Sequence, residues 1–198
     1  MKSRRMAGSR RGSRITISSV FLVFFTGCSL MQPNSYLDTE MDFGTIKTVA
    51  VMPFGNLSGD RSASVRVRDV FVTKLLATYG VYVLPTGEVV DGISRIGVVD
   101  STNPAPEEVV KLAAKIKANA VITGTLREYG EVRSGQTSAN VISLSVQLME
   151  AETGKIVWSA SATRGGVSIL DRLFGGGGGQ AMNHITEKAV DDVINQLF

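Results

Sequence analysis

The chain has few of the side chains that catalytic and metal sites use most often. Its 198 residues include one cysteine, one histidine and one tryptophan. A lone cysteine cannot form a disulfide within the chain, and a single histidine leaves a transition-metal site almost without ligands. No GxSxG nucleophile motif with a histidine partner is present. The composition therefore predicts no metal, no cofactor and no enzymatic activity.

Long apolar runs are scarce as well, and the run near the start of the chain is short. Residues 15–25 read ITISSVFLVFF. As a helix they would span about 16 Å, roughly half of a ~30 Å hydrocarbon core. The segment before this run contains no acidic residue and six basic ones, which are Lys2, Arg4, Arg5, Arg10, Arg11 and Arg14. This order indicates a secretory signal peptide rather than a membrane-spanning helix.

The single cysteine follows this apolar run directly. Cys28 comes after Thr26 and Gly27, and small residues before a cysteine are typical of bacterial lipoprotein signals, although leucine is usual where Phe25 stands. We predict that residues 1–27 are a lipoprotein signal peptide and that Cys28 is lipidated, which anchors the chain to a membrane. An aspartate after the cysteine favours retention in the inner membrane of Gram-negative bacteria. Ser29 therefore indicates the outer membrane, with the domain on its periplasmic face.

The basic character of the whole chain belongs to this leader. Six of the 21 lysines and arginines lie before Cys28, and none of the 18 acidic residues does. Residues 28–198 thus hold 15 basic and 18 acidic side chains, a net charge of −3. The pI of about 9.1 for the complete sequence gives no reason to expect nucleic-acid binding.

The remaining chain reads as a tether followed by one domain. Residues 28–45 have no clean periodicity and contain Pro33 and Gly44, so we expect a tether there. Apolar periodicity predicts strands over 46–54, 81–84, 120–129, 141–149 and 156–163, and helices over 61–79, 86–96, 106–117 and 181–198. We assign 130–138 to a polar turn. The order β-α-β-α-α-β-β-β-α predicts a single α/β sandwich over residues 46–198, a mixed sheet covered by helices.

Several short segments and one histidine are considered as candidate sites. The loop 55–60 opens a helix after a strand, but it lacks the lysine and the glycine spacing of nucleotide-binding motifs, so we expect a turn with Asp60 or Ser62 capping the helix. His184 is expected on the surface. The adjacent pairs 107–108 and 191–192 are acidic, and neighbours on a helix point apart, so we read solvated faces rather than a catalytic pair.

The most unusual stretch follows the last predicted strand. Four apolar residues precede five consecutive glycines at 175–179, and they are Ile169, Leu170, Leu173 and Phe174. A run of glycines forms a flexible hinge. The apolar group before it could contact a neighbouring copy, a partner protein or the bilayer surface. A loop folded back over its own sheet is the other interpretation.

Several motifs together resemble one family. After the lipidated cysteine come VAVMPFGNLSGD at 49–60, AVITGTLREYG at 120–130 behind a helix ending in KIKAN, and VQLMEAETGKIVWSASA at 146–162. Their order resembles the curli secretion lipoprotein (CsgG-like) superfamily. The loop 127–140 is polar and has no apolar row for lipid. The chain is therefore similar to the small tethered lipoproteins such as PelC rather than to the pore-forming curli channel.

This resemblance implies a function in the cell envelope. Most members are non-enzymatic assembly or export proteins, and several form rings. We expect a scaffold or accessory subunit of an export system for exopolysaccharide or surface proteins, with envelope protein partners and as a homo-oligomer. The alternative is a regulator that activates an inner-membrane enzyme such as a peptidoglycan synthase. That role predicts a monomer with a long tether.

Overall fold

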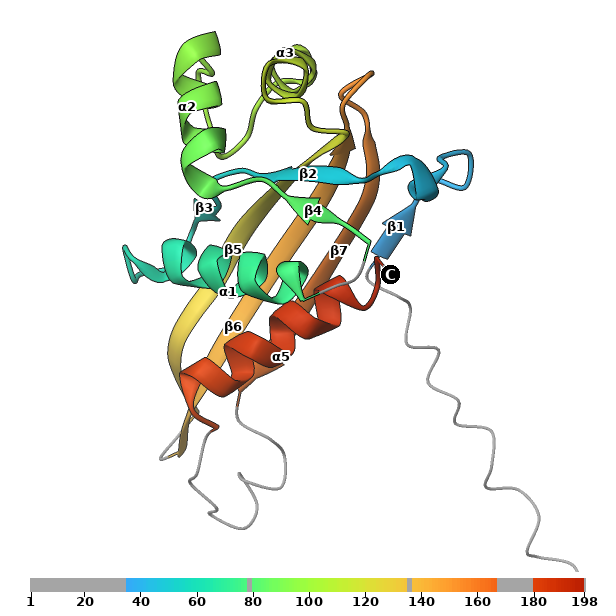
Figure 1. Ribbon diagram of the computed structural model, residues 1–198. Coiled ribbons are helices and arrows are strands. Elements are labelled where there is room, and N and C mark those ends of the chain that lie inside the picture. The colour runs from blue at the N-terminus through green and yellow to red at the C-terminus, as the bar shows by residue number, and fades with distance from the viewer. Residues whose placement is uncertain (1–34, 78–79, 135–136, 167–179, 198) are drawn as a thin grey trace, which may run out of the picture. The chain divides into compact units, whose positions relative to one another are not determined.

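The computed structural model describes residues 35–77, 80–134, 137–166 and 180–197, all within one compact unit (Figure 1). The sheet has seven strands in the order β1-β7-β6-β5-β2-β4, and β3 pairs with β5 beside this path. The pairs β2–β4, β2–β5 and β3–β5 are parallel, whereas β5, β6, β7 and β1 pair antiparallel. The predicted mixed α/β sandwich is confirmed.

The strands are β1 (Ser35–Leu37), β2 (Thr48–Val51), β3 (Gly55–Asn56), β4 (Tyr82–Val83), β5 (Ala120–Ser134), β6 (Thr137–Glu150) and β7 (Ile156–Gly165). The α-helices are α1 (Ala63–Leu76), α2 (Thr86–Ile96), α3 (Pro106–Ile116) and α5 (Met182–Ile194), and η1 (Phe43–Thr45) is a 3-10 turn. The predicted order of elements is confirmed, and β1, η1 and β3 are additions to it.

One face of the sheet is covered by α1 and α5 (Figure 1). Alternate residues of β6, from Ile142 to Leu148, point to this face and are buried. Phe71 of α1 lies against Phe54 with ring centroids 5.6 Å apart. Trp158 is buried under α5, where its indole N–H donates to the Gln196 carbonyl at 3.1 Å. The strand and helix periodicities of the sequence therefore meet in one large core.

The opposite face carries a smaller core beneath α2 and α3. It includes Ala50, Val121 and Met149 from the strands. Gly92 lets the two helices approach closely, because a Cβ built there would lie 2.5 Å from the Ile116 Cγ2 atom and 2.9 Å from the Leu112 Cδ1 atom. α2 ends at Gly97 with φ of 70°, a left-handed conformation that glycine adopts readily.

The hairpin of β5 and β6 is longer than the sequence predicts. Residues 130–134 and 137–138, assigned above to a polar turn, belong to the strand ladder, with Val132 opposite Ala139 and Arg133 opposite Ser138. The prediction was wrong because it followed apolar periodicity. The end of the hairpin is held by backbone hydrogen bonds between strands with mostly polar side chains. The register shifts once, between Leu126 and Glu128, where a bulge bends β5.

The folded domain begins earlier than residue 46. β1 pairs antiparallel with β7, with Ser35 opposite Ala160 and Leu37 opposite Trp158. The Asp38 amide also donates to the Val157 carbonyl at 2.8 Å. Residues 35–45, which we assigned to the tether, are therefore part of the domain. A three-residue strand has no readable periodicity, since only its pairing with β7 defines it.

Candidate interaction surface

The short segment that comprises β3 and the loop leading to α1 presents an apolar side chain to solvent. We call residues 55–62 the Leu57 loop. Its start is fixed to the sheet, because β3 pairs with β5 and the Leu57 amide donates to the Leu126 carbonyl at 2.8 Å. The Leu57 side chain is nevertheless 73% exposed. Its position at the sheet edge is thus set by the backbone, while its side chain contributes little to the core.

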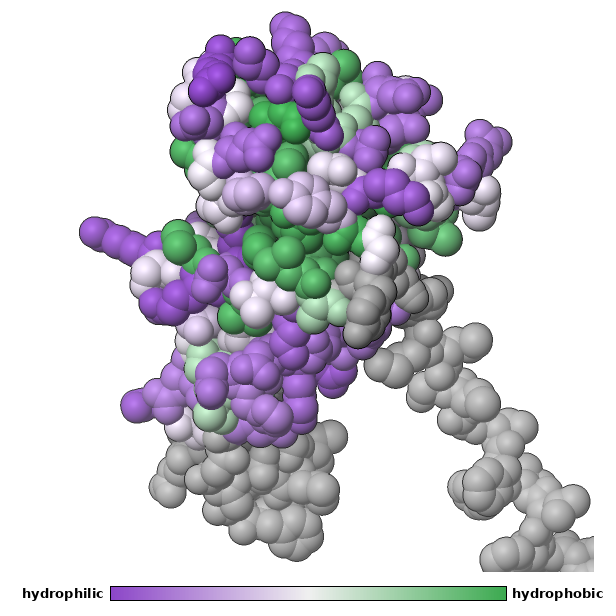
Figure 2. Space-filling view, viewed as in Figure 1, coloured by the Kyte–Doolittle hydropathy of each residue, from purple (hydrophilic) through white to green (hydrophobic). Residues whose placement is uncertain are grey.

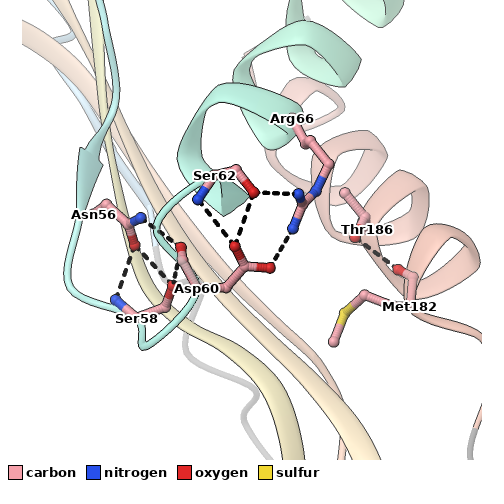
Figure 3. A network of polar contacts seen from close by, with 7 residues as sticks. All are labelled: Asn56, Ser58, Asp60, Ser62, Arg66, Met182 and Thr186. Carbon is pink, nitrogen blue, oxygen red and sulfur yellow. Dashed lines mark hydrogen bonds and ion pairs between the residues drawn. The ribbon is translucent and has the colours of Figure 1, made fainter.

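Polar side chains inside the Leu57 loop hold its shape (Figure 3). Asn56 accepts from the Ser58 amide at 3.0 Å and from the Ser58 hydroxyl at 2.7 Å, and its own amide donates to the Asp60 carbonyl at 2.8 Å. Asp60 accepts from the Ser62 amide at 2.9 Å, one residue before α1 begins. The expected turn is present and Ser62 occupies the N-cap position, but neither Asp60 nor Ser62 makes a side-chain capping bond to α1, so that part of the prediction was wrong. Loops closed by side-chain bonds to their own backbone are preorganised.

The same loop is tied to the first turns of α1 and to the sheet. Asp60 forms an ion pair with Arg66 of α1 (Figure 3). The guanidinium of Arg66 lies over the Tyr129 ring of β5, 5.6 Å from its centroid, within the range of a cation–π contact. Hydrogen bonds from the amide and the hydroxyl of Ser62 lower the pKa of Asp60, so its carboxylate stays charged at neutral pH.

An apolar pocket lies toward the opposite end of α1. Figure 2 shows a hydrophobic area on this side of the molecule, between β4 and the C-terminal ends of α1 and α5. The pocket is lined by apolar side chains from several elements, which are Phe43, Ile46, Val49, Leu75, Val81, Ile122, Leu148 and Leu197. Leu76 and Tyr82 directly follow the lining residues Leu75 and Val81 in the chain, and they are 58% and 59% exposed. The lining residues Leu75, Ile122 and Leu148 are at most 1% exposed, so the pocket is a small cavity of about 20 Å³ at the edge of the main core.

Charges of opposite sign accompany the loop and the pocket. Asp38, Glu40 and Asp42 precede Phe43 of the pocket, and Lys47 follows Ile46, so residues 38–47 carry a net charge of −2. In the Leu57 loop, Asp60 is paired with Arg66, whereas Arg61 is exposed and has no ion pair among the described residues. The formal charges of the neighbouring Arg127 and Glu128 of β5 cancel.

Two further predictions about charged residues have different outcomes. Glu108 is not a free solvated side chain, because it accepts from the Ala105 amide at 2.8 Å and from the Val99 amide at 2.9 Å. These two bonds lower the pKa of Glu108. Asp191 and Asp192 do point apart, but each meets a cation, Lys74 at 3.1 Å and Arg164 respectively. These ion pairs fasten α5 to α1 and to β7.

Other side chains of interest have structural roles or lie outside the described part. His184 is exposed on α5, as expected. Thr186, buried under the same helix, donates to the Met182 carbonyl at 2.7 Å (Figure 3). Cys28 and the four apolar residues Ile169, Leu170, Leu173 and Phe174 fall outside the described residues, so their roles stay predictions.

Neither a metal site nor a membrane helix is seen among the described residues. No group of three or more histidine, cysteine, aspartate and glutamate side chains in those ranges could hold a metal ion. None of the helices that the structure describes is both long and apolar enough to cross a membrane. Two features of the described surface stand out, the preorganised Leu57 loop with its exposed leucine and the small apolar pocket.

A family model described as "Putative lipoprotein GNA1162-like" matches residues 39–197. The chain belongs to this GNA1162-like lipoprotein family. The matched residues include η1 and exclude β1. The match supports the predicted similarity to small tethered lipoproteins. The wider curli superfamily stays a resemblance. A search of curated proteins finds no match to the chain.

Two solved structures share this fold, and a third has a lower similarity to it. Lipoprotein GNA1162 from Neisseria meningitidis is 22% identical with a TM-score of 0.54, over 76% of this chain and 97% of the other. A PelC dodecamer from Paraburkholderia phytofirmans is 18% identical with a TM-score of 0.52, over 76% and 87%. The LpoB C-terminal domain from Salmonella enterica is 16% identical with a TM-score of 0.49, over 63% and 87%.

Sequence reasoning did not find the pocket or the exposed Leu57. The pocket is assembled from residues as far apart as Phe43 and Leu197, and no local pattern marks such a site. Leu57 had a detectable signal, since it is the one apolar residue in the polar stretch Asn56–Asp60. The predicted turn accounted for the polar residues of that stretch but not for the leucine.

Proposed function

We propose that the protein is an outer-membrane lipoprotein, anchored through lipid on Cys28, whose domain faces the periplasm as a scaffold of an envelope export or assembly system. Its action is positional and not enzymatic. The domain holds partner proteins near the membrane, and it does so as a homo-oligomer. The observation that carries this proposal is a lipoprotein-family domain that follows a basic leader, a short apolar run and the chain's only cysteine, which is the pattern of a lipoprotein signal.

The short connection between Cys28 and the sheet supports a scaffold close to the membrane. Because β1 begins at Ser35, only residues 28–34 lie between the lipid and the domain. Seven residues reach at most about 25 Å when fully extended. An activator that must reach an inner-membrane enzyme would need a longer tether. The PelC structure, described as a dodecamer, supports self-assembly as a property of this fold.

Replacing the cysteine tests the anchor. We expect Cys28→Ser to move the protein from the membrane fraction to the soluble periplasmic fraction and to abolish incorporation of labelled palmitate. The reason is that serine has no thiol to carry the lipid, and this lipid is the proposed anchor. Cell fractionation with immunoblotting measures the first effect. A Cys28→Ser protein that stays wholly in the membrane fraction would refute lipid anchoring.

A second substitution tests the destination separately from the anchor. Ser29→Asp keeps the lipid and adds the residue that favours the inner membrane, so density-gradient separation should show a shift from outer to inner membrane. Ser29→Ala is the matched control and should leave the distribution unchanged. If the wild-type protein already lies in the inner membrane, the outer-membrane part of the proposal is wrong, while anchoring through Cys28 can still hold.

A further inference from the structure

An open groove lies where α3 meets the turn between β6 and β7, and we call it the α3 groove. It has a volume of about 380 Å³, within the range of pockets that hold ligands. Figure 1 shows α3, η1 and this turn near one end of the sheet. The lining includes four apolar and two acidic residues, which are Met41, Val110, Ala114, Ala118, Glu150 and Glu152. All of these except Ala118 are half-buried or exposed, so the groove is accessible from solvent.

The charged side chains that line the α3 groove are both acidic. Glu150 accepts from the Thr153 hydroxyl at 2.6 Å, and neither Glu150 nor Glu152 has an ion pair within the described ranges. The lysines of α3 do not line the groove. They follow the lining residues Val110 and Ala114 by one position, about 100° further round the helix. A segment that fits this groove therefore combines apolar side chains with positive charge.

The Leu57 loop and the first turn of α1 have this combination on their surface. Leu57 is 73% exposed, and Val65 in that first turn is 69% exposed. Residues 55–68 hold one acidic and three basic side chains, a net charge of +2, and they are Asp60, Arg61, Arg66 and Arg68. Arg61 is exposed, and it belongs to no ion pair of the part of the chain that the structure describes. It is therefore available to meet a carboxylate on another molecule.

In one subunit the Leu57 loop and the α3 groove lie apart along β5. The Leu57 amide donates to the Leu126 carbonyl, whereas Asn119, which also lines the groove, directly precedes the first residue of β5. Seven residues of extended chain separate Asn119 from Leu126 by about 23 Å. The loop therefore cannot fill the groove of its own subunit, and these two surfaces can meet only between different copies.

We propose that the Leu57 loop of one subunit docks in the α3 groove of a neighbouring subunit, so that copies join head to tail. This inference rests on the homo-oligomer in the proposed function and names its contact. Leu57 lies against the apolar wall of the groove, and Arg61 lies beside Glu150 and Glu152. Each copy uses one loop and one groove, and such heterologous contacts close into rings when the rotation allows.

A second copy of this chain suits the groove for two reasons. The first is charge, because the positive segment 55–68 meets two unpaired glutamates and the neighbouring segment 38–47, whose net charge is −2. Opposite charges around an apolar contact favour this partner and this orientation. The second is rigidity, because bonds within the Leu57 loop and to Arg66 fix its shape before any contact forms. A preordered loop loses little conformational entropy on binding.

The apolar part of the contact is tested in the acylated protein extracted in detergent. Leu57→Asn should raise the dissociation constant for self-association by about tenfold or more, because a leucine buried in the contact is lost. Val99→Asn is the matched control, since Val99 is 93% exposed and lies between α2 and α3. It should leave the mass distribution unchanged. Native mass spectrometry measures assembly, and circular dichroism checks that both variants are folded.

A charge exchange tests the polar part of the contact. Arg61→Glu and Glu152→Arg should each weaken self-association by about tenfold, because each places like charges together. The two substitutions combined in one chain should restore assembly, because the opposite charges meet again with their signs exchanged. Lys188→Glu is the matched control for Arg61→Glu. Lys188 is exposed on α5, and its reversal should leave assembly unchanged.

A cysteine pair tests the direction of the contact. Leu57→Cys combined with Ala114→Cys should give a ladder of dimers, trimers and larger species under mild oxidation, since the two sites are too far apart to pair within one subunit. Either single variant alone should give no crosslink, and a mixture of the two single variants should give dimers only. A dimer from Leu57→Cys alone would overturn the head-to-tail arrangement.

The outcomes separate this inference from the proposed function. An oligomeric wild type whose mass distribution is unaffected by Leu57→Asn and Arg61→Glu would overturn the contact between loop and groove and leave the homo-oligomer standing. Weaker assembly in Leu57→Asn without a ladder from the double cysteine variant would overturn the groove as the docking site. A wild type that is monomeric at every concentration would overturn both proposals. Restored assembly in the charge exchange, together with the ladder, is the result we expect.

Discussion

Among the described residues, the core on the sheet face that α1 and α5 cover contains 25 buried apolar residues, whereas the core beneath α2 and α3 contains 11. The larger core extends from β2 to β7, while the smaller one stops near Val121 and Met149. Beyond these two residues, the positions of β5 and β6 that point away from α1 and α5 include Thr123, Ser143 and Ser145. Stability is therefore concentrated on the α1–α5 face, which also carries the pocket.

Removing a large side chain from the larger core should have the greatest effect. Phe71 is 1% exposed and contacts Phe54, so Phe71→Ala leaves a cavity and should lower the free energy of unfolding by about 3–5 kcal/mol. Urea denaturation measures the change. Leu76→Ala in the same helix is the control, because Leu76 is largely exposed and its loss should change stability by only about 0.5 kcal/mol. Equal effects of the two substitutions would contradict the burial described here.

Adding one methyl group to the smaller core should have a smaller effect. The new Cβ of Gly92→Ala would collide with Ile116 and Leu112 of α3, and overpacking of this kind costs about 1–3 kcal/mol. Gly87→Ala in the same helix is the control, because nothing lies within 4 Å of its new Cβ and alanine favours helix by about 1 kcal/mol.

Hydrogen exchange can locate the effect of Gly92→Ala. Faster exchange should appear in α2 and α3, with the strands β6 and β7 protected as before, if the smaller core can loosen by itself. Equal loss of protection in α5 would mean that the two faces unfold as one unit. That result would weaken the division between a stable face and a locally mobile one.

Much of this architecture could be predicted from the sequence because the spacing of apolar residues indicates most of the helices and strands. The alternation of Ile142, Leu144, Val146 and Leu148 defines β6, and the predicted helix over 86–96 has the observed bounds of α2. Where pattern is lacking, prediction fails. β1 has three residues and depends on β7, and the end of the β5–β6 hairpin depends on backbone pairing between polar segments.

The candidate site was less predictable than the fold. Lipidation at Cys28 is a local signal and could be proposed directly. The pocket requires the C-terminal ends of α1 and α5 to meet η1 and β4, which is a consequence of topology. Similarly, Glu108 looked like one of two solvated acids, but the turn before Ala105 brings the Val99 amide to it. Such contacts depend on chain reversals that periodicity does not encode.

The mass of the acylated wild-type protein in detergent tests the central claim most directly. Native mass spectrometry over a range of concentrations should show an assembly of several subunits, since the proposed scaffold is a homo-oligomer. A species of one defined subunit number that persists on dilution is the predicted result. A single subunit at all concentrations would contradict the account of this lipoprotein as a self-assembling scaffold.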